Sequence, residues 1–322
     1  MKWNRIQVLI VLLMTGLFCV ISQAADVSRS DIPAGSNWYV HINLDLIQNS
    51  GVGRRLMAET IDEALDEVQG ELDIDIRNEV EGITVFGRKL PERGDAAKEG
   101  AVIFHGALSL DTQGALLSAL ERKGAEVTAL DNIGLTYYRI ENDGGTMTYT
   151  NEDGHVEEVD WGHHEVVYFS FGPSQTLLTQ NQDLMQAFLD GGGYLGGFET
   201  VDSEALLILQ ADRALVQGGA NTSAETGGDW DSSVLKNVDA LALVIAEQND
   251  GLQVSAQLTA SSPDMAMAVR NIVEGVVALK ALDESEGELG EILRQVRFEN
   301  DGVNLHINVP VTAGQIEALK DL

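Results

Sequence analysis

The sequence predicts an α+β protein built from two ferredoxin-like β-α-β-β-α-β repeats, each with an antiparallel sheet and its helices on one face. Three observations lead to this prediction. Apolar residues follow strand-like and helix-like periods in the same order in both halves of the chain. Two short segments of the first half recur in the second half at one constant offset. Asn-Asp-Gly triplets stand beside apolar runs, where they favour tight hairpin turns.

The chain begins with the parts of an export signal in their usual order. Lys2 and Arg5 precede an almost wholly apolar run over residues 6–21. Ser22-Gln23-Ala24 then offers small residues at the two positions that a signal peptidase reads. We therefore expect a cleaved signal peptide over residues 1–24. An uncleaved anchor is the alternative, although the apolar run is short for a membrane span. The mature chain is expected outside the cytoplasm, in the periplasm of a Gram-negative bacterium or fully secreted.

The mature chain is strongly acidic. The sequence has 20 basic and 51 acidic residues, and loss of Lys2 and Arg5 with the signal peptide takes the net charge from −31 to −33. This charge repels nucleic acid and anionic lipid head groups, and it favours a cationic protein or peptide as partner. The one cysteine, Cys19, leaves with the signal peptide, which excludes disulfides and thiol chemistry. No second apolar run is long enough to insert into a membrane.

The first repeat is predicted over residues 25–190. Alternating apolar residues indicate its strands, and apolar residues three or four positions apart indicate its helices. Asp111 and Thr112 are candidate N-caps of its second helix, which we expect to end at Gly124. The predicted elements are a strand at 38–44, a helix around 56–68, strands at 83–87 and 101–108, a helix at 112–124 and a strand at 135–140.

A glycine-rich linker over residues 191–203 leads to a second repeat over residues 204–322. Asn249-Asp250-Gly251 predicts a hairpin turn. Ser262 is the expected N-cap of a helix with Pro263 at its first position. The apolar stripe of that helix comprises Met265, Val269, Ile272, Val273, Val276 and Leu279. The predicted strands lie at 205–210, 240–246, 252–258, 296–298 and 303–309.

The two halves of the chain contain similar segments, which indicates an internal duplication. The matching segments are residues 80–85 with 238–243 and residues 138–144 with 296–302, both at an offset of 158. Two matches at one offset, with the same order of elements around them, are typical of a repeat. We therefore expect the halves to superpose, with Arg139 and Arg297 at equivalent places beside turns.

The opening of the mature chain carries a family resemblance. Ile32-Pro33-Ala34 is followed by the strand Tyr39-Val40-His41-Ile42-Asn43-Leu44. With the signal peptide and the duplicated α+β halves, this arrangement resembles a loose group of exported bacterial proteins of unknown function. The resemblance covers most of the mature chain and implies no catalytic residues.

An insertion over residues 144–164 interrupts the first repeat, and we expect it to form a hairpin turning at residues 151–154. Imidazole and carboxylate side chains gather there, a combination that suits zinc or another divalent cation. The candidate metal ligands are His155, Glu157, Asp160, His163, His164 and Glu165. Strand alternation places His155 and Glu157 on one face and Glu158 and Asp160 on the other, so no face collects three certain ligands. A solvated acidic hairpin that guards against aggregation is the other interpretation.

No catalytic motif has the context that its chemistry needs. Gly191–Gly196 matches G-x-G-x-x-G, but a helix rather than a strand is expected before it. Ser233–Lys236 matches S-x-x-K without the companion motifs of serine acyltransferases. His41, His105 and His306 lie inside apolar strands, where packed strand residues are expected rather than ligands.

The sequence therefore favours a non-enzymatic extracytoplasmic binding or interaction protein. The alternative is a divalent-metal-binding protein or a metal-assisted hydrolase that uses residues 155–165.

Overall fold

The protein is described by a computed structural model, which covers residues 32, 36–54, 65–66, 69–70, 74–88, 100–142, 146–150, 156–160, 165–190, 205–213, 238–282 and 287–320. The predicted signal peptide, the turn of the inserted hairpin and the glycine-rich linker lie outside these residues. So does most of the predicted helix at 56–68.

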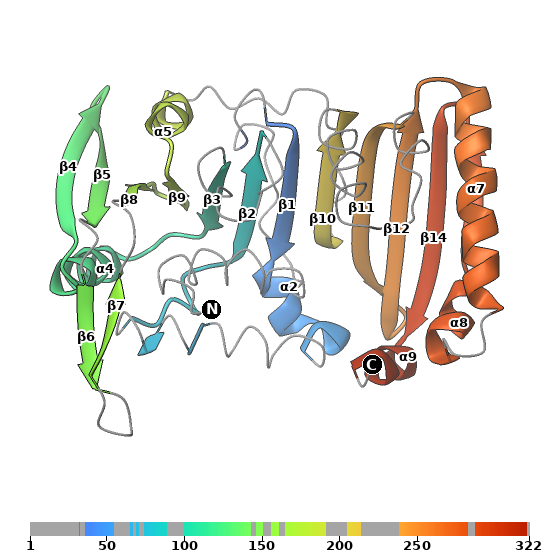
Figure 1. The fold of residues 1–322 in the computed structure, drawn as a ribbon, viewed down its shortest axis with the longest axis horizontal. Coiled ribbons are helices and arrows are strands. Elements are labelled where there is room, and N and C mark those ends of the chain that lie inside the picture. Colours follow the sequence, from blue (N-terminus) through green and yellow to red (C-terminus); the bar gives the residue numbers. More distant parts are fainter. Residues whose placement is uncertain are drawn as a thin grey trace.

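Twelve strands in the described part of the chain form one sheet (Figure 1). The first half contributes β1 (Trp38–Asn43), β2 (Gly82–Gly87), β3 (Gly100–His105), β4 (Glu126–Asn132), β5 (Leu135–Asn142), β8 (Glu165–Phe171) and β9 (Gln175–Thr179). The second half contributes β10 (Ala205–Asp212), β11 (Val238–Gln248), β12 (Gly251–Ala260), β13 (Arg297–Asp301) and β14 (Asn304–Thr312). Their order is β13-β14-β12-β11-β10-β1-β2-β3-β9-β8-β5-β4.

The predicted α+β class with antiparallel sheet is confirmed, because neighbouring strands of this sheet are antiparallel throughout. A ferredoxin-like arrangement within each half is not confirmed. Successive strands β1, β2 and β3 are neighbours, and the two halves share one sheet where β1 pairs with β10. The first strand of each half, β1 or β10, is largely buried on both faces, as expected in the middle of a sheet.

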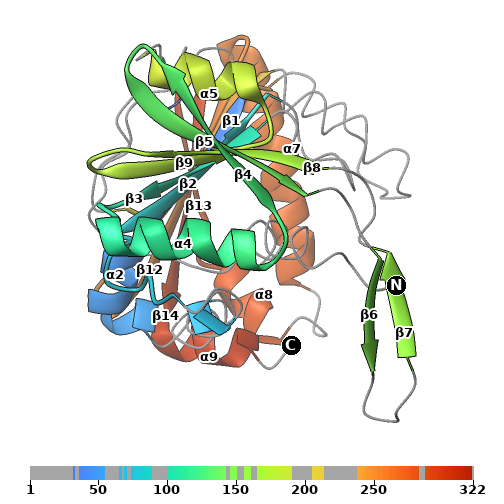
Figure 2. The ribbon, with the colours of Figure 1, turned by 90° about the vertical axis from the view of Figure 1, so that its left-hand side faces the viewer.

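The helices lie on both faces of the sheet, which corrects the prediction that they share one face. Described helices are α2 (Leu44–Asn49), α4 (Leu110–Arg122), α5 (Gln182–Leu189), α7 (Pro263–Ala281), α8 (Gly287–Leu293) and α9 (Ala313–Lys320). Figure 2 shows α5 above the central strands and α4 and α2 below them. Both faces of these strands are apolar, so each face needs its own cover.

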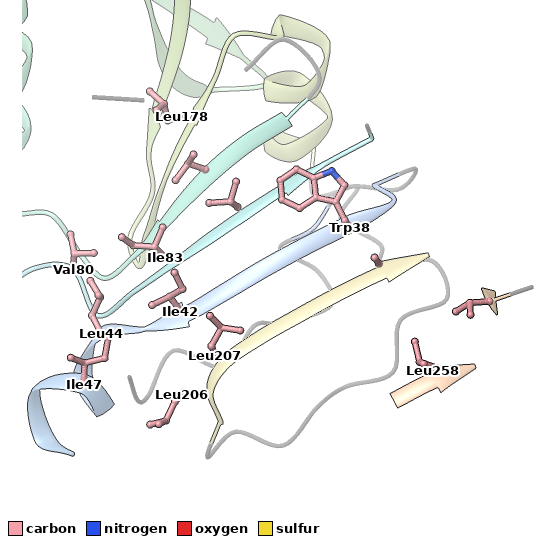
Figure 3. Packing of buried hydrophobic residues seen from close by; sticks show 14 of the residues in the cluster. Trp38, Ile42, Leu44, Ile47, Val80, Ile83, Leu178, Leu206, Leu207 and Leu258 are labelled. Atoms are coloured by element: carbon pink, nitrogen blue, oxygen red, sulfur yellow. The ribbon is translucent and has the colours of Figure 1, made fainter. Parts of the chain in front are cut away.

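Two hydrophobic clusters correspond to the two faces. Ile42, Ile83 and Leu207 of adjacent strands pack together with Ile47 of α2 in the first cluster (Figure 3). Leu184 of α5 belongs to the second cluster. The second cluster also contains Tyr39, Phe86, Ile103, Leu177 and Met185. The core therefore lies around β1, β2, β3 and β9.

The predicted strand at 101–108 ends early, at His105. Gly106 has φ +120°, and a Cβ there would stand 2.0 Å from the carbonyl oxygen of Glu79. Only glycine permits this close approach of two backbone segments. The backbone then leaves the sheet, and the Gly106 N–H donates to the carbonyl of Ser174 at 2.8 Å.

Turn and cap predictions in the second half are confirmed. Asn249 and Asp250 have φ of 52° and 62°, as the hairpin between β11 and β12 requires. The Ser262 hydroxyl accepts a hydrogen bond from the Met265 N–H at 3.2 Å and caps α7. In the first half, Ser109 rather than Asp111 or Thr112 caps α4.

The predicted equivalence of Arg139 and Arg297 is wrong. Arg139 lies on β5, between β4 and β8, whereas Arg297 lies on the edge strand β13, so the arginines are not equivalent. The apolar stripe predicted for α7 includes Ile272 and Leu279, whose side chains are exposed. Periodicity locates an apolar stripe without stating how much of it a neighbour covers.

Within the described residues, no helix has both the length and the apolar character needed to cross a membrane.

Candidate functional site

The predicted metal segment lies mostly outside the described residues. His155, His163 and His164 are not described, and of the remaining candidates Glu157 and Asp160 lie on β7 while Glu165 begins β8. Among the described residues, no group of three or more His, Cys, Asp or Glu side chains could hold a metal ion. The metal site therefore stays a prediction.

The inserted hairpin itself is present. Strands β6 (Thr146–Thr150) and β7 (Val156–Asp160) form a two-stranded antiparallel sheet of their own, which stands away from the main sheet in Figure 2. In its register Glu157 is opposite Tyr149 and Asp160 is opposite Thr146. Residues 157 and 160 have opposite parity along the strand, so the backbone places them on opposite faces.

Two of the strand histidines meet in the core. The hydroxyl of Thr84 on β2 is 2.8 Å from Nδ1 of His41 on β1 and 2.7 Å from Nε2 of His105 on β3. All three side chains are buried, and the two imidazole rings meet edge to face with centroids 5.3 Å apart. The strand register brings these side chains together. Thr84 lies directly opposite His41 on β1 and directly opposite Ile103 on β3, and Ile103 is two residues before His105.

The hydroxyl links the protonation of the two rings. It has one hydrogen to donate, so it donates to one imidazole nitrogen and accepts from the other. Burial lowers the pKa of the His105 imidazole to about 4. At neutral pH His105 is therefore neutral, and both histidines are hydrogen-bonded to Thr84. This arrangement favours a structural role in strand packing over a role in proton transfer.

Sequence reasoning placed His41 and His105 in apolar strands correctly but did not bring them together. The third strand histidine, His306 on β14, is far from this pair in strand order and is opposite Gln257. Its side chain is half-buried. The alternation of apolar residues shows which strand positions share a face, but not which strands are neighbours.

One face of the sheet carries an unbroken apolar row across all twelve strands. Cross-strand neighbours define the row, and each of its members is aliphatic or aromatic. From β4 to β13 it comprises Ala129, Tyr138, Phe169, Leu178, Val102, Val85, Val40, Leu209, Leu243, Ala256, Ile307 and Phe298.

Coverage of this row changes along the sheet. Leu178, Val102 and Val85 are buried, whereas Leu243, Ala256 and Ile307 are only half-buried. The helix α7 packs against β12, β13 and β14, and in Figure 1 it stands at the margin of the molecule beyond β14. The described part of the second half thus leaves an apolar sheet face partly open to solvent.

The half-buried aliphatic residues on this face extend beyond the row itself. They lie on three adjacent strands and point to the same side by register. We call them the open apolar face: Leu241, Leu243, Ile245, Leu252, Val254, Ala256, Ile307, Val309 and Val311.

On the opposite face, β12 and β14 carry polar residues, whereas β11 carries alanines and Val244. Ser255 donates from its hydroxyl to Asn308 Oδ1 at 2.8 Å, and Thr259 donates to Asn304 Oδ1 at 2.9 Å. These groups bond across the strands, so that face can meet water without loss. The aliphatic side chains of the open apolar face form no hydrogen bonds, so their contact with water is unfavourable.

Comparison with known proteins adds little. No protein-family model and no curated protein matches the chain. Among solved structures, crystal form III of TP0453 is similar with a TM-score of 0.48 and 12% identity, over 93% of this chain and 99% of that chain. Crystal form IV has a TM-score of 0.48 and 10% identity, over 92% and 98%. At these values the likeness carries no argument about fold, site or function.

Proposed function

We propose that this protein is a non-enzymatic binding protein that acts outside the cytoplasm and binds an apolar ligand on the open apolar face. The observation that carries the proposal is the partial exposure of nine aliphatic side chains on three adjacent strands. A sheet face of this composition is normally covered by a helix or a second sheet.

The proposal has a simple energetic basis. Each Å² of apolar surface removed from water stabilises the complex of protein and ligand by roughly 25 cal/mol. Leu243, Ala256 and Ile307 are still partly solvated in the protein alone, so a ligand that covers them gains this energy. Contiguous exposed apolar surface on a soluble protein commonly marks an interaction site.

A neutral fluorescent probe tests the proposal. N-phenyl-1-naphthylamine carries no charge, so the acidic surface does not repel it, and its emission rises in an apolar site. We expect saturable binding by the wild-type protein. Ala256→Gln, which puts a polar side chain in the middle of the open apolar face, should weaken binding about tenfold, equal to about 1.4 kcal/mol.

Ala242→Gln is the matched control. Ala242 is also half-buried and lies one position before Leu243 on β11, so it points to the opposite face of the sheet, across from Gln257. This variant receives the same substitution in a neighbouring strand and should bind the probe as the wild type does. Equal loss in both variants, or no saturable binding by the wild type, would reject the open apolar face as the site.

We also propose export with removal of residues 1–24. The support is the order of basic, apolar and small residues at the start of the chain. Mass spectrometry of the protein from its native host should find an N-terminus at Ala25. A chain that still begins at Met1 contradicts export by this route.

We further propose that the two halves are repeats. Outward from the centre, the first half runs β1, β2, β3 and then the hairpin of β9 and β8. The second half runs β10, β11, β12 and then the hairpin of β14 and β13, and each hairpin is followed by a helix, α5 or α9. The hairpin of β4 and β5 is then an addition to the first half. An experimental structure in which these five-strand sets fail to superpose would reject the duplication.

A further inference from the structure

The outer face of α7 is apolar although it meets solvent. Four large apolar side chains at or just after this helix are exposed: Met267 at 58%, Ile272 at 48%, Leu279 at 72% and Leu282 at 77%. By helical period Ile272 and Leu279 lie beside the stripe of the buried Val269, whereas Met267 and Leu282 lie on the far side of the helix. An exposed helix face normally carries charged and polar residues.

The exposed residues follow a regular spacing. Ala268, Ile272, Gly275, Leu279 and Leu282 succeed one another at intervals of four, three, four and three residues, and all five are exposed. This spacing averages 3.5 residues, the repeat by which one helix packs along another. We call these five residues the α7 seam. The small residues Ala268 and Gly275 flank Ile272, which leaves gaps for the side chains of a facing helix.

Gly275 gives a second and independent indication. A glycine inside a helix costs about 1 kcal/mol relative to alanine. Nothing in the described structure requires it, because a Cβ at Gly275 would meet no heavy atom within 4 Å and its φ is not in the left-handed region. A helix that packs closely on the seam would require a residue without a side chain at this position.

Charge decides the kind of partner. Residues 264–301 contain nine acidic and four basic residues, and the whole chain has a net charge of −31. Glu274 on α7 and Glu291 on α8, which packs against α7, are exposed, and Glu288 on α8 is half-buried. This charge opposes a second copy of the chain and an anionic membrane, and it attracts a basic segment.

We propose that the α7 seam docks a cationic amphipathic helix of a partner protein, whose apolar stripe packs on the seam and whose Lys and Arg side chains meet the surrounding acids. This surface is distinct from the open apolar face, so the inference does not depend on the proposed function.

A pair of synthetic peptides tests the charge and the geometry together. The cationic peptide has about three heptads, with leucine at a and d and lysine at e and g, and the acidic peptide has glutamate in place of lysine. Fluorescence anisotropy with labelled peptides gives Kd. We expect the cationic peptide to bind the wild-type protein and the acidic peptide not to bind. The variant Ile272→Gln/Leu279→Gln should raise Kd at least tenfold.

Gly275→Ala separates docking from folding, because its two expected effects differ in sign. The added methyl should raise Tm by roughly 2 °C through helix propensity. The same methyl should raise Kd for the cationic peptide severalfold, because it fills the gap in the seam.

The helix α4 offers matched controls. Gly114 is also inside a helix with no heavy atom within 4 Å of its would-be Cβ, and Leu110 is 83% exposed. Gly114→Ala should raise Tm without a change in Kd, and Leu110→Gln should leave Kd unchanged.

Three outcomes overturn the inference. The first is equal Kd for wild type and Ile272→Gln/Leu279→Gln, which would leave only non-specific charge attraction. The second is equal binding of the acidic and cationic peptides. The third is absence of peptide binding together with flotation on phosphatidylcholine vesicles that Leu279→Gln abolishes, which would make the seam a membrane contact.

Discussion

The two halves of the sheet use similar apolar strands in different ways. Every residue of β2 in the first half is buried, and so are five of the six residues of β1. In the second half β11 has only one buried residue, and its other apolar residues are half-buried. Both sets of strands are rich in β-branched and aliphatic residues. Hydrophobicity therefore determines that these segments form strands, and their neighbours determine whether a face is covered.

Position in the sheet explains the difference. The strands β1, β2 and β3 lie between the two hydrophobic clusters, one of which includes α2 and the other α5. The strands β11, β12 and β14 lie further out, where α7 packs near the edge. The strands β1, β2 and β3 are thus covered on both faces, whereas β11, β12 and β14 are only partly covered.

Truncation of one large side chain in each half should give the largest contrast. Phe86 on β2 is fully buried, so Phe86→Ala should lower the free energy of unfolding by about 3–5 kcal/mol. Leu243 on β11 is half-buried, so Leu243→Ala should cost only about 1–2 kcal/mol, since less apolar surface and a smaller cavity are involved. Urea unfolding followed by circular dichroism measures both losses. Equal losses would contradict the difference in burial between β2 in the first half and β11 in the second half.

Lowering the pH should reduce the free energy of unfolding in part through His105, which lies in the first half. Burial lowers the pKa of this imidazole from 6.5 to about 4. Above pH 6.5 it is neutral in the folded and the unfolded chain, so it contributes no pH dependence there. Between pH 6.5 and about 4 the unfolded chain binds a proton that the folded chain does not, and the free energy of unfolding falls by about 1.4 kcal/mol per pH unit.

The variant His105→Gln isolates this effect from the titration of the many carboxylates. Glutamine stays neutral and can still hydrogen-bond with Thr84. The variant should lose about 3 kcal/mol less than the wild type between pH 6.5 and 4. Parallel stability curves for wild type and His105→Gln would show that His105 is not buried as neutral imidazole.

Helix caps give a smaller contrast between the halves. Ser262 caps α7 with one hydrogen bond from Met265 N–H, so Ser262→Ala should cost about 1 kcal/mol. Ser109 caps α4 with the same bond from Thr112 N–H at 3.2 Å and also donates from its hydroxyl to Glu79 at 3.0 Å. Burial acts to raise the pKa of Glu79, but hydrogen bonds from Ser109 and Thr112 outweigh it and hold this pKa below its usual value.

Loss of the Ser109 hydroxyl therefore removes the N-cap of α4 and one hydrogen-bond donor to the ionised carboxylate of Glu79. Ser109→Ala should lower the free energy of unfolding by roughly 2 kcal/mol, more than Ser262→Ala does. Thermal unfolding of the two variants at pH 7 provides the comparison, and a greater loss for Ser262→Ala would reverse it.

Local signals were sufficient for part of the fold. Asn249-Asp250-Gly251 gave the turn between β11 and β12, and Ser262 with Pro263 gave the start of α7, because each depends on a few consecutive residues. The pairing of β1 with β10 depends on residues far apart in the chain, such as Val40 and Leu209, whose contact no local pattern encodes. The same is true of His41, Thr84 and His105.

The candidate surfaces were harder to predict than the strands that carry them. Alternation identified Leu241, Leu243 and Ile245 as one face of a strand, but exposure of that face depends on where α7 packs. The stripe on α7 was found by period, yet Ile272 and Leu279 turned out to be outside the contact with the sheet. Sequence pattern gives the apolar faces, and the tertiary structure decides which of them stay open.

The inserted hairpin is the last point of contrast, since β6 and β7 come between β5 and β8 in the first half and the described part of the second half has no such pair. If the hairpin is a zinc site, zinc should raise Tm with the logarithm of its concentration, because the ion binds the folded chain only. We expect no measurable shift at micromolar zinc, because strand alternation sends Glu157 and Asp160 to opposite faces of β7 and the acids repel one another. Isothermal titration of the wild type and of His163→Ala/His164→Ala decides the matter. Zinc binding by the wild type that the double variant loses would establish the metal site and make the insertion a functional addition to the first half.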